Sequence, residues 1–220
     1  MAHAERLLSP STPKTPPGEG LRERKKRATR AAIQRAALQL FTKQGYDRTT
    51  TEEIARAADV SLGTLFNYFP SKEALVGDEY DPLFIQLLES RPPDEPIFTA
   101  IRQALEAMLR SILAEEDRGF LMARAKLTLE VPALRAASLL ERESSARLLQ
   151  ELLAKRSKRK AHDFELKVTS AILVSAISAA LESWTESGGK TDLMKLVGRA
   201  LEVAEQGARF ESSPPSKARR

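Results

Sequence analysis

Residues 49–75 read TTTEEIARAADVSLGTLFNYFPSKEAL, and this stretch carries the start signals of two short helices. Thr50 is followed three positions later by Glu53, the spacing at which a hydroxyl caps a helix and a carboxylate reaches back to the capping amide. A second start follows at Ser61, after a turn at Asp59 and Val60. Two short helices joined by a tight turn, with small alanines at their crossing, predict a helix-turn-helix.

The second helix of this unit has an unusual outward face. At about 100° per residue, Leu65 and Phe69 share one side, and Phe66 falls so near them that we expect it in the core. The opposite side offers hydrogen-bonding groups and almost no charge over about 12 Å, which suits the major groove of DNA. An asparagine there can bond in both directions with an adenine edge, so Asn67 is the predicted base reader. The predicted DNA contacts on this helix are Leu62, Gly63, Thr64, Asn67 and Tyr68.

The net charge of the chain is concentrated in its first third. Lysine and arginine outnumber aspartate and glutamate by 13 to 8 over residues 1–75, whereas residues 76–220 carry 22 of each. Such an excess indicates a polyanionic partner, either nucleic acid or an anionic membrane surface, and a solvated basic face without a target is the alternative. Because the densest block directly precedes the first helix, we expect phosphate or minor-groove contacts from Arg24, Lys25, Lys26 and Arg27.

The run from Arg30 to Leu75 resembles the DNA-binding domain of the TetR family of bacterial transcriptional regulators. The matching motifs are a Thr-Thr pair that opens the second helix, a GTLFNYF segment on the reading helix, and PSKEAL after it. The resemblance implies phosphate contacts from Thr50 and Lys72, and a close approach of Gly63 and Thr64 to the groove.

Two positions depart from the family pattern. Phe66 replaces the common tyrosine, and Tyr68 replaces the common histidine. A phosphate hydrogen bond is therefore lost at Phe66, and the hydroxyl of Tyr68 stands two positions further along to supply it.

The rest of the chain is predicted to be helical, which makes the fold all-α. Apolar residues recur at spacings of three and four, with no period-two alternation. A fourth helix is expected from Ser71 past Val76, with a bend at Pro82. The other expected helices cover 95–114, 119–130, 133–155, 163–187 and 191–209. The resulting domains are a disordered proline-rich tail (1–21), the DNA-binding domain (22–75), a larger effector-binding and dimerisation domain (76–210) and a second disordered tail (211–220).

The segment VTSAILVSAISAALESW, residues 168–184, is apolar or small almost all round. Such a helix must be covered on every side, and a two-fold partner is one way to cover it. A fully internal helix in a monomer is the alternative. The family resemblance implies that the last two helices pair with their copies. The expected dimer contacts are Ala171, Ser175, Ala179, Leu193, Val197, Leu201 and Ala204.

The middle helices carry aromatic and methionine side chains that suit an adaptable apolar pocket, although plain core is the commoner use of such stripes. The predicted effector is small, lipophilic and able to carry an anionic end, with Arg102, Arg124 and Lys126 as the nearest charges. The candidate ligand contacts are Phe84, Leu88, Phe98, Met108, Ile112, Phe120, Met122 and Trp184.

Several function classes lack support in the sequence. The chain has no cysteine, which removes disulfides and thiolate chemistry. His162 beside Asp163 is its one acid–base pairing, and no Glu-x-x-His or phosphate-loop motif occurs, so we expect no enzyme, no metal and no cofactor. No apolar run of about 18 residues and no signal peptide is apparent, which predicts a cytoplasmic protein with no membrane partner.

The leading hypothesis is a sequence-specific regulator, most simply a dimeric repressor that a small ligand releases from a double-stranded DNA operator. An architectural DNA-binding protein without an effector is compatible with the same first third of the chain. A helical enzyme is a third and weaker reading.

Overall fold

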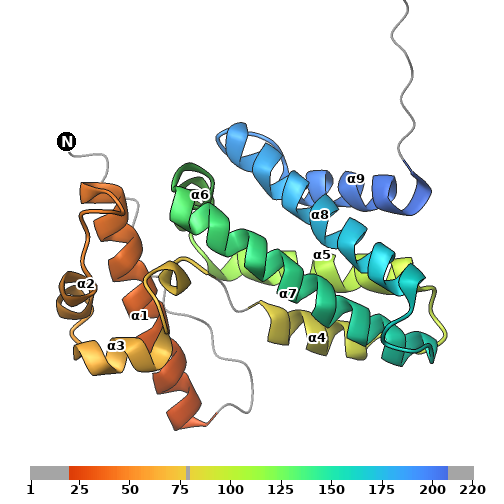
Figure 1. The fold of residues 1–220 in the computed structure, drawn as a ribbon, viewed down its shortest axis with the longest axis horizontal. Coiled ribbons are helices and arrows are strands. Elements are labelled where there is room, and N and C mark those ends of the chain that lie inside the picture. Colours follow the sequence, from red (N-terminus) through yellow and green to blue (C-terminus); the bar gives the residue numbers. More distant parts are fainter. Residues whose placement is uncertain (1–19, 78–79, 208–220) are drawn as a thin grey trace, which may run out of the picture.

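The computed structural model of the chain describes residues 20–77 and 80–207, and the regular elements in these ranges are all helical. This confirms the all-α prediction, while the expected tails over 1–21 and 211–220 lie outside the described residues except for Gly20 and Leu21, the latter being the first residue of the first helix. A small domain at the N-terminal side adjoins a larger helical body (Figure 1). The elements are α1 (Leu21–Gln44), α2 (Thr51–Ala57), α3 (Leu62–Tyr68), the 3-10 turn η2 (Glu73–Leu75), α4 (Asp81–Glu89), α5 (Ile97–Glu115), α6 (Arg118–Glu130), α7 (Pro132–Ser157), α8 (Phe164–Glu186) and α9 (Leu193–Gln206).

Helices α1, α2 and α3 form the small domain around one hydrophobic core. Side-chain caps fix where α2 and α3 begin. Thr50 and Glu53 make both bonds of a capping box, and the Ser61 hydroxyl accepts from the Thr64 amide. The turn between the two helices passes through Asp59 in the left-handed region, with φ of 55°. The predicted helix-turn-helix is therefore present, and its fully buried side chains are Ile33, Ala37, Ile54, Leu65 and Phe69.

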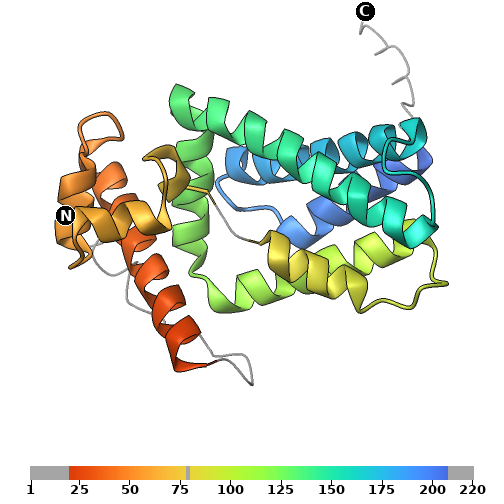
Figure 2. The ribbon, with the colours of Figure 1, turned by 60° about the horizontal axis from the view of Figure 1, so that its bottom comes forward.

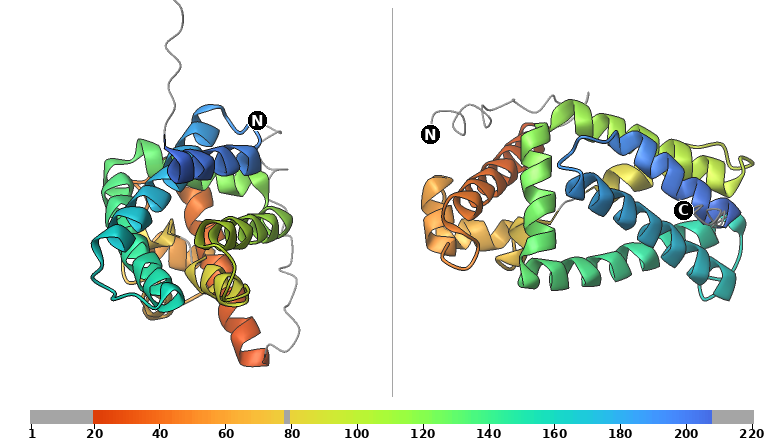
Figure 3. Two further views of the ribbon diagram at one scale, coloured as in Figure 1. Left: turned by 90° about the vertical axis from the view of Figure 1, so that its right-hand side faces the viewer. Right: turned by 90° about the horizontal axis from the view of Figure 1, so that it is seen from above.

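The larger body is a bundle in which α8 packs along α7 and α9, α4 packs on α5, and α6 packs on α7. These pairs are visible from below in Figure 2. Helix α6 lies between the small domain and the rest of the bundle, and it contacts α1 (Figure 3, right). The five helices expected between residues 95 and 209 are all found, with ends that differ by at most three residues.

The expected fourth helix from Ser71 past Val76 is wrong. Residues after Pro70 make only the single turn η2, and α4 begins at Asp81. Pro82 does not bend a helix, because it lies in the first turn of α4, where its missing N–H needs no partner.

The basic block does not precede the first helix, as the sequence suggested, but is part of it. Helix α1 begins at Leu21, so Arg24, Lys25, Lys26 and Arg27 occupy its first two turns. These cations are therefore arranged around the first turns of a helix, and Lys25 and Lys26 are the two that face the end of α3.

The α9 part of the expected dimer surface is wrong for three of its four residues. Leu193, Val197 and Leu201 are buried in the core of their own chain, with Val197 only 1% exposed, and Ala204 packs against the same core. This apolar side of α9 packs against α5 and α8 of the same chain. Ala171, Ser175 and Ala179 of α8 are exposed, so these three predicted contacts remain available to a partner.

Helix α8 is long and apolar enough to cross a bilayer by length and composition, with a mean hydropathy of 1.6 over 18 residues. The expectation that the chain contains no apolar segment long enough to span a bilayer is therefore wrong. Only 22% of that window is buried within the chain, and the helix packs on α7 and α9 along its other side. One such helix is weak support for a membrane protein, because helices that pack against protein pass the same test.

Candidate nucleic-acid interface and ligand cavity

Helix α3 presents the outward face that the sequence predicted. Leu65 and Phe69 have no exposed surface, whereas Gly63 and Asn67 are exposed on the opposite side. The hydroxyl oxygens of Thr64 and Ser61 are 2.8 Å apart, so Thr64 is held against the start of its own helix. This arrangement leaves Asn67 as the polar side chain with the freest access to a base edge.

The expectation that Phe66 belongs to the core is wrong. Its side chain is 45% exposed and lies outside the hydrophobic cluster of the small domain. Phe66 is one turn of α3 from Leu62 and Gly63 and projects beside the reading face. Sequence reasoning missed it because its angular position, about 60° from that of Phe69, was taken as sufficient for burial.

Arg30 of α1 fixes the C-terminal end of α3. Its Nη1 donates a hydrogen bond of 2.8 Å to the carbonyl oxygen of Tyr68, and its guanidinium lies 4.1 Å from the centre of the Phe69 ring. A cation at this point also complements the negative end of the helix dipole. In the sequence analysis, Arg30 was only the first residue of the segment that resembles the family, and its contact with α3 was not predicted.

An open groove joins the basic end of α1 to the end of α3. Lys25, Lys26, Asn67 and Tyr68 all line it, so the structure brings four of the predicted DNA contacts together. Arg24 and Arg27 do not line this groove. The sequence analysis missed its other lining residues, which are Leu21, Arg22 and Thr29.

The two remaining predicted phosphate contacts are engaged within the chain. Both the amide and the hydroxyl of Thr50 bond to Glu53, and the backbone amide of Thr50 is the main reason that the pKa of the Glu53 carboxyl is lowered. Lys72 Nζ donates a 2.6 Å hydrogen bond to the carbonyl oxygen of Tyr46. An ammonium group has three N–H bonds, so Lys72 retains donors for a phosphate, and its contact with DNA stays a prediction.

The helical body contains a cavity of about 590 Å³. Of the candidate ligand contacts, Phe84, Met108, Ile112 and Trp184 line it. The other four do not line it: Leu88 belongs to the buried core, Phe98 and Met122 pack against that core, and Phe120 lies off the cavity near the start of α6. A helical stripe identifies an inward face but does not say which inward side chains border empty space.

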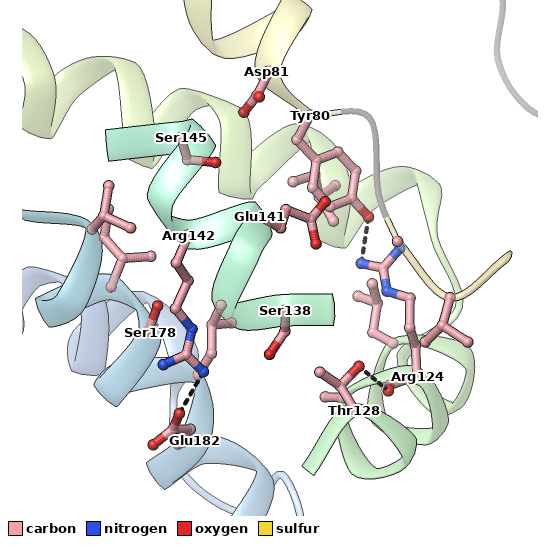
Figure 4. Close-up of a pocket in the computed structure, with 18 of the residues that line it drawn as sticks. Tyr80, Asp81, Arg124, Thr128, Ser138, Glu141, Arg142, Ser145, Ser178 and Glu182 are labelled. Atoms are coloured by element: carbon pink, nitrogen blue, oxygen red, sulfur yellow. Dashed lines mark hydrogen bonds and ion pairs between the residues drawn. The ribbon is translucent and has the colours of Figure 1, made fainter. Parts of the chain in front are cut away.

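Two polar clusters lie on the cavity wall (Figure 4). In one, Tyr80 donates to Glu116 at 2.6 Å and accepts from Arg124 at 2.9 Å, and burial raises the pKa of the Tyr80 phenol. In the other, Arg142 of α7 pairs with Glu182 of α8 at 2.8 Å.

The expected cationic contacts are only partly present at the cavity. Arg124 lines it, but Arg102 pairs with Glu205 at 2.9 Å between α5 and α9. Lys126 pairs with Glu130 at 3.7 Å on an exposed face of α6. The cavity wall instead holds four carboxylates and two arginines: Glu73, Asp81, Glu141, Glu182, Arg124 and Arg142.

The cavity wall extends into the small domain. The segment from Ser71 to Gly77 borders the cavity, and its carbonyl at Gly77 accepts a 2.7 Å hydrogen bond from Gln34 of α1. Leu134 of α7 belongs to the hydrophobic cluster of the small domain and also lines the cavity. The cavity and the DNA-binding domain therefore share wall residues.

The acid–base pair suggested by the sequence is used structurally. Asp163 caps the start of α8 and pairs with Arg159 at 2.7 Å, while His162 is exposed. Hydrogen bonds from the Leu166 backbone and from Arg159 lower the pKa of the Asp163 carboxyl against the opposing effect of desolvation. Asp163 therefore serves as the N-terminal cap of α8.

A helix-turn-helix whose first helix begins with a basic segment, joined to a helical body with a ligand-sized cavity, is the architecture of a DNA-binding transcription regulator. The chain belongs to the tetR family of bacterial regulatory proteins: the model of that family matches residues 33–78, and the model of the MftR C-terminal domain matches residues 95–209.

Relatives of known class are similar to most of the chain. The transcriptional regulator TcmR of Streptomyces glaucescens is 38% identical over 155 residues, which cover 67% of this chain and 69% of TcmR. MftR of Mycobacterium tuberculosis is 26% identical over 194 residues, 87% of this chain and 96% of that protein. Among solved structures, the repressor FadR of Thermus thermophilus in complex with lauroyl-CoA has a TM-score of 0.52 and 27% identity, over 86% of this chain and all of that one.

Proposed function

We propose that the protein is a homodimeric repressor that a small lipophilic molecule releases from its operator. The observation that carries this proposal is the position of the cavity. Its wall includes Glu73, Gly77 and Leu134, which also contact the DNA-binding domain, and these shared residues support a coupling between occupancy of the cavity and the position of α3.

The dimer is proposed from the surface of α8. Ile172 is 46% exposed, and Val168 on the same side of this helix is 38% exposed. The small side chains of Ala171, Ser175 and Ala179 share the exposed surface of α8 and permit the close approach of another helix. A second copy related by a two-fold axis would cover this surface and place two reading helices on half-sites spaced by about 34 Å, one turn of DNA.

The mechanism requires that the ligand prefer one arrangement of the two reading helices. A ligand that binds both arrangements equally well shifts nothing, however tightly it binds. By linkage, the factor by which the ligand weakens operator binding equals the factor by which the operator weakens ligand binding.

The apolar wall supports a lipophilic ligand, and the relative FadR holds lauroyl-CoA. The charges on the wall favour a ligand with a neutral or cationic end over one with a carboxylate, because four carboxylates face two arginines and both arginines have carboxylate partners. The sequence-based idea of an anionic end rested on Arg102, Arg124 and Lys126. Arg124 does line the cavity, but it is paired with Glu116, and the other two cations pair elsewhere.

The test uses operator fragments that the protein retains from the genomic DNA of its source. Dodecylamine, dodecanol and dodecanoate share one chain length and differ in charge, and each is added to the protein–operator complex alongside lauroyl-CoA and a sugar. We expect release by the amine or the alcohol at lower concentration than by the carboxylate. Release by the sugar alone would contradict the lipophilic assignment. Uniform coating of unrelated DNA would favour the architectural alternative.

A further inference from the structure

Phe66 has an exposure that the protein's own packing does not explain. Among the described residues of the small domain, Leu21 and Phe66 are the large apolar side chains with more than a third of their surface exposed. Leu21 is the first residue of α1, where exposure is common, but Phe66 lies inside the helix that carries the reading face. The hydrophobic core of the domain is complete without it, since Leu65 and Phe69 fill the inward side of α3.

The exposed face of α3 is divided into two sides. Asn67 and Tyr68 border the groove that also contains Lys25 and Lys26. Phe66 is turned away from that groove by about 100° from Asn67 and lies over Leu62, which is half-buried. One side of the face is thus polar and basic, and the other is apolar.

Gly63, one turn before Phe66, leaves additional space beside this apolar side. A Cβ atom at Gly63 would meet no side chain nearer than the Ser61 hydroxyl at 3.9 Å, so the fold of this chain does not require glycine there. Glycine is used where a backbone must approach a ligand closely, and the open space beside Gly63 leaves room for DNA next to Phe66.

We propose that Phe66 reads a thymine by packing against its 5-methyl group. The inference rests on the DNA-binding role of α3 and is independent of the ligand and the dimer. The major groove offers an apolar group only at thymine, whereas phosphates need donors that a phenyl ring lacks. Phe66 therefore adds a second specificity determinant to Asn67, on the opposite side of the reading face.

The experiment starts from a binding site selected with the full-length protein from a random DNA pool. Each thymine of the selected site is then replaced singly by deoxyuridine, which removes only the methyl group. We expect one thymine in each half-site at which this replacement weakens binding about fourfold, the factor for burial of one methyl group. In Phe66→Ala, which should bind the parent site about tenfold more weakly, that sensitivity should disappear.

Two controls separate base reading from a general loss of binding. Asn67→Ala should lose affinity but keep the deoxyuridine effect, and Phe66→Leu should keep part of it because the side chain stays apolar. Thermal unfolding of each variant checks that the fold is intact, as expected for exposed positions. The proposal is overturned if no thymine replacement affects the parent protein, or if Phe66→Ala retains the same sensitivity at every thymine.

Discussion

The hydroxyl of Tyr46 donates a hydrogen bond of 2.9 Å to the carboxylate of Glu73, joining the core of the DNA-binding domain to the wall of the cavity. The backbone carbonyl of Tyr46 accepts from Lys72, the neighbour of Glu73, so two bonds tie the same short segment to the small domain. The phenol is almost fully buried, and its pKa is raised by desolvation and by the bond to Glu73.

Tyr46→Phe should destabilise the folded chain by about 1.5 kcal/mol, the low end for a hydrogen bond to a charged group, because Glu73 is partly solvated. Urea unfolding at neutral pH measures the change. The ring and its packing on Phe41 are retained in this variant, which isolates the hydroxyl. Unfolding free energies equal to those of the parent would mean that the bond contributes nothing to stability.

The same bond predicts a pH dependence. The pKa of the Glu73 carboxyl is lowered from its ordinary value of 4.5 by its own backbone amide first, and then by Ser71 and Tyr46. A depressed pKa contributes stability above the ordinary pKa and loses it as the pH falls below about 4.5 through the folded value. We expect Glu73→Gln to reduce the loss of stability between pH 6 and pH 3, roughly the range in which carboxyls titrate. An identical acid profile for the parent and the variant would refute this role.

The contact of Arg30 with α3 predicts a loss of DNA affinity from a residue behind the reading face. Arg30→Met removes the bond to the Tyr68 carbonyl and the cation over Phe69, and we expect operator binding to weaken about tenfold. Arg30→Lys is the matched control, because it keeps the charge but not the planar geometry, and it should restore only part of the affinity. Equal affinities of parent and Arg30→Met would show that the end of α3 needs no such support.

Gly63→Ala should separate stability from function. Alanine fits the space beside Ser61 and favours the helix, so the chain should become more stable by up to about 1 kcal/mol. The added methyl group projects toward the DNA, and binding should weaken at least about tenfold. The two measurements are thermal unfolding and operator affinity. A variant that binds as tightly as the parent would place DNA farther from α3 than we infer.

Two arginine substitutions distinguish the outer face of α8 from the buried stripe of α9. Ile172→Arg should give folded monomers in sedimentation, because Ile172 is exposed in the single chain. Val197→Arg should instead lower stability by more than about 3 kcal/mol, because it buries an unpaired charge in the core. Folded dimers of Ile172→Arg would exclude this surface as the interface.

The successes of sequence reasoning came from local signals. The Thr50–Glu53 capping box, the Ser61 cap and the apolar spacing of the helices depend on residues a few positions apart, and all are present. The expected helix after Pro70 failed because the 71–77 segment is held by long-range bonds to Gln34 and Tyr46.

The errors in the predicted dimer and DNA-binding residues also arise from contacts that local patterns do not contain. Val197 and its stripe have the pattern of an interface helix, but periodicity does not say whether the covering surface belongs to the same chain. Phe66 was misassigned because α3 is so short that a small difference in angle decides exposure. The role of Arg30 depends on the distance between α1 and the end of α3, which no local pattern contains.

The most direct measurement follows the cavity and the operator in one titration. Trp184 is the one tryptophan of the sequence, is 2% exposed and lines the cavity, so its fluorescence reports occupancy. Dodecylamine is added to the protein bound to dye-labelled operator, with tryptophan emission and dye anisotropy recorded together. We predict that both signals change with the same half-saturation and that Met108→Phe, which narrows the cavity without adding a second tryptophan, shifts both to higher concentration. A full change in Trp184 emission while the operator stays bound would contradict a cavity that controls DNA binding.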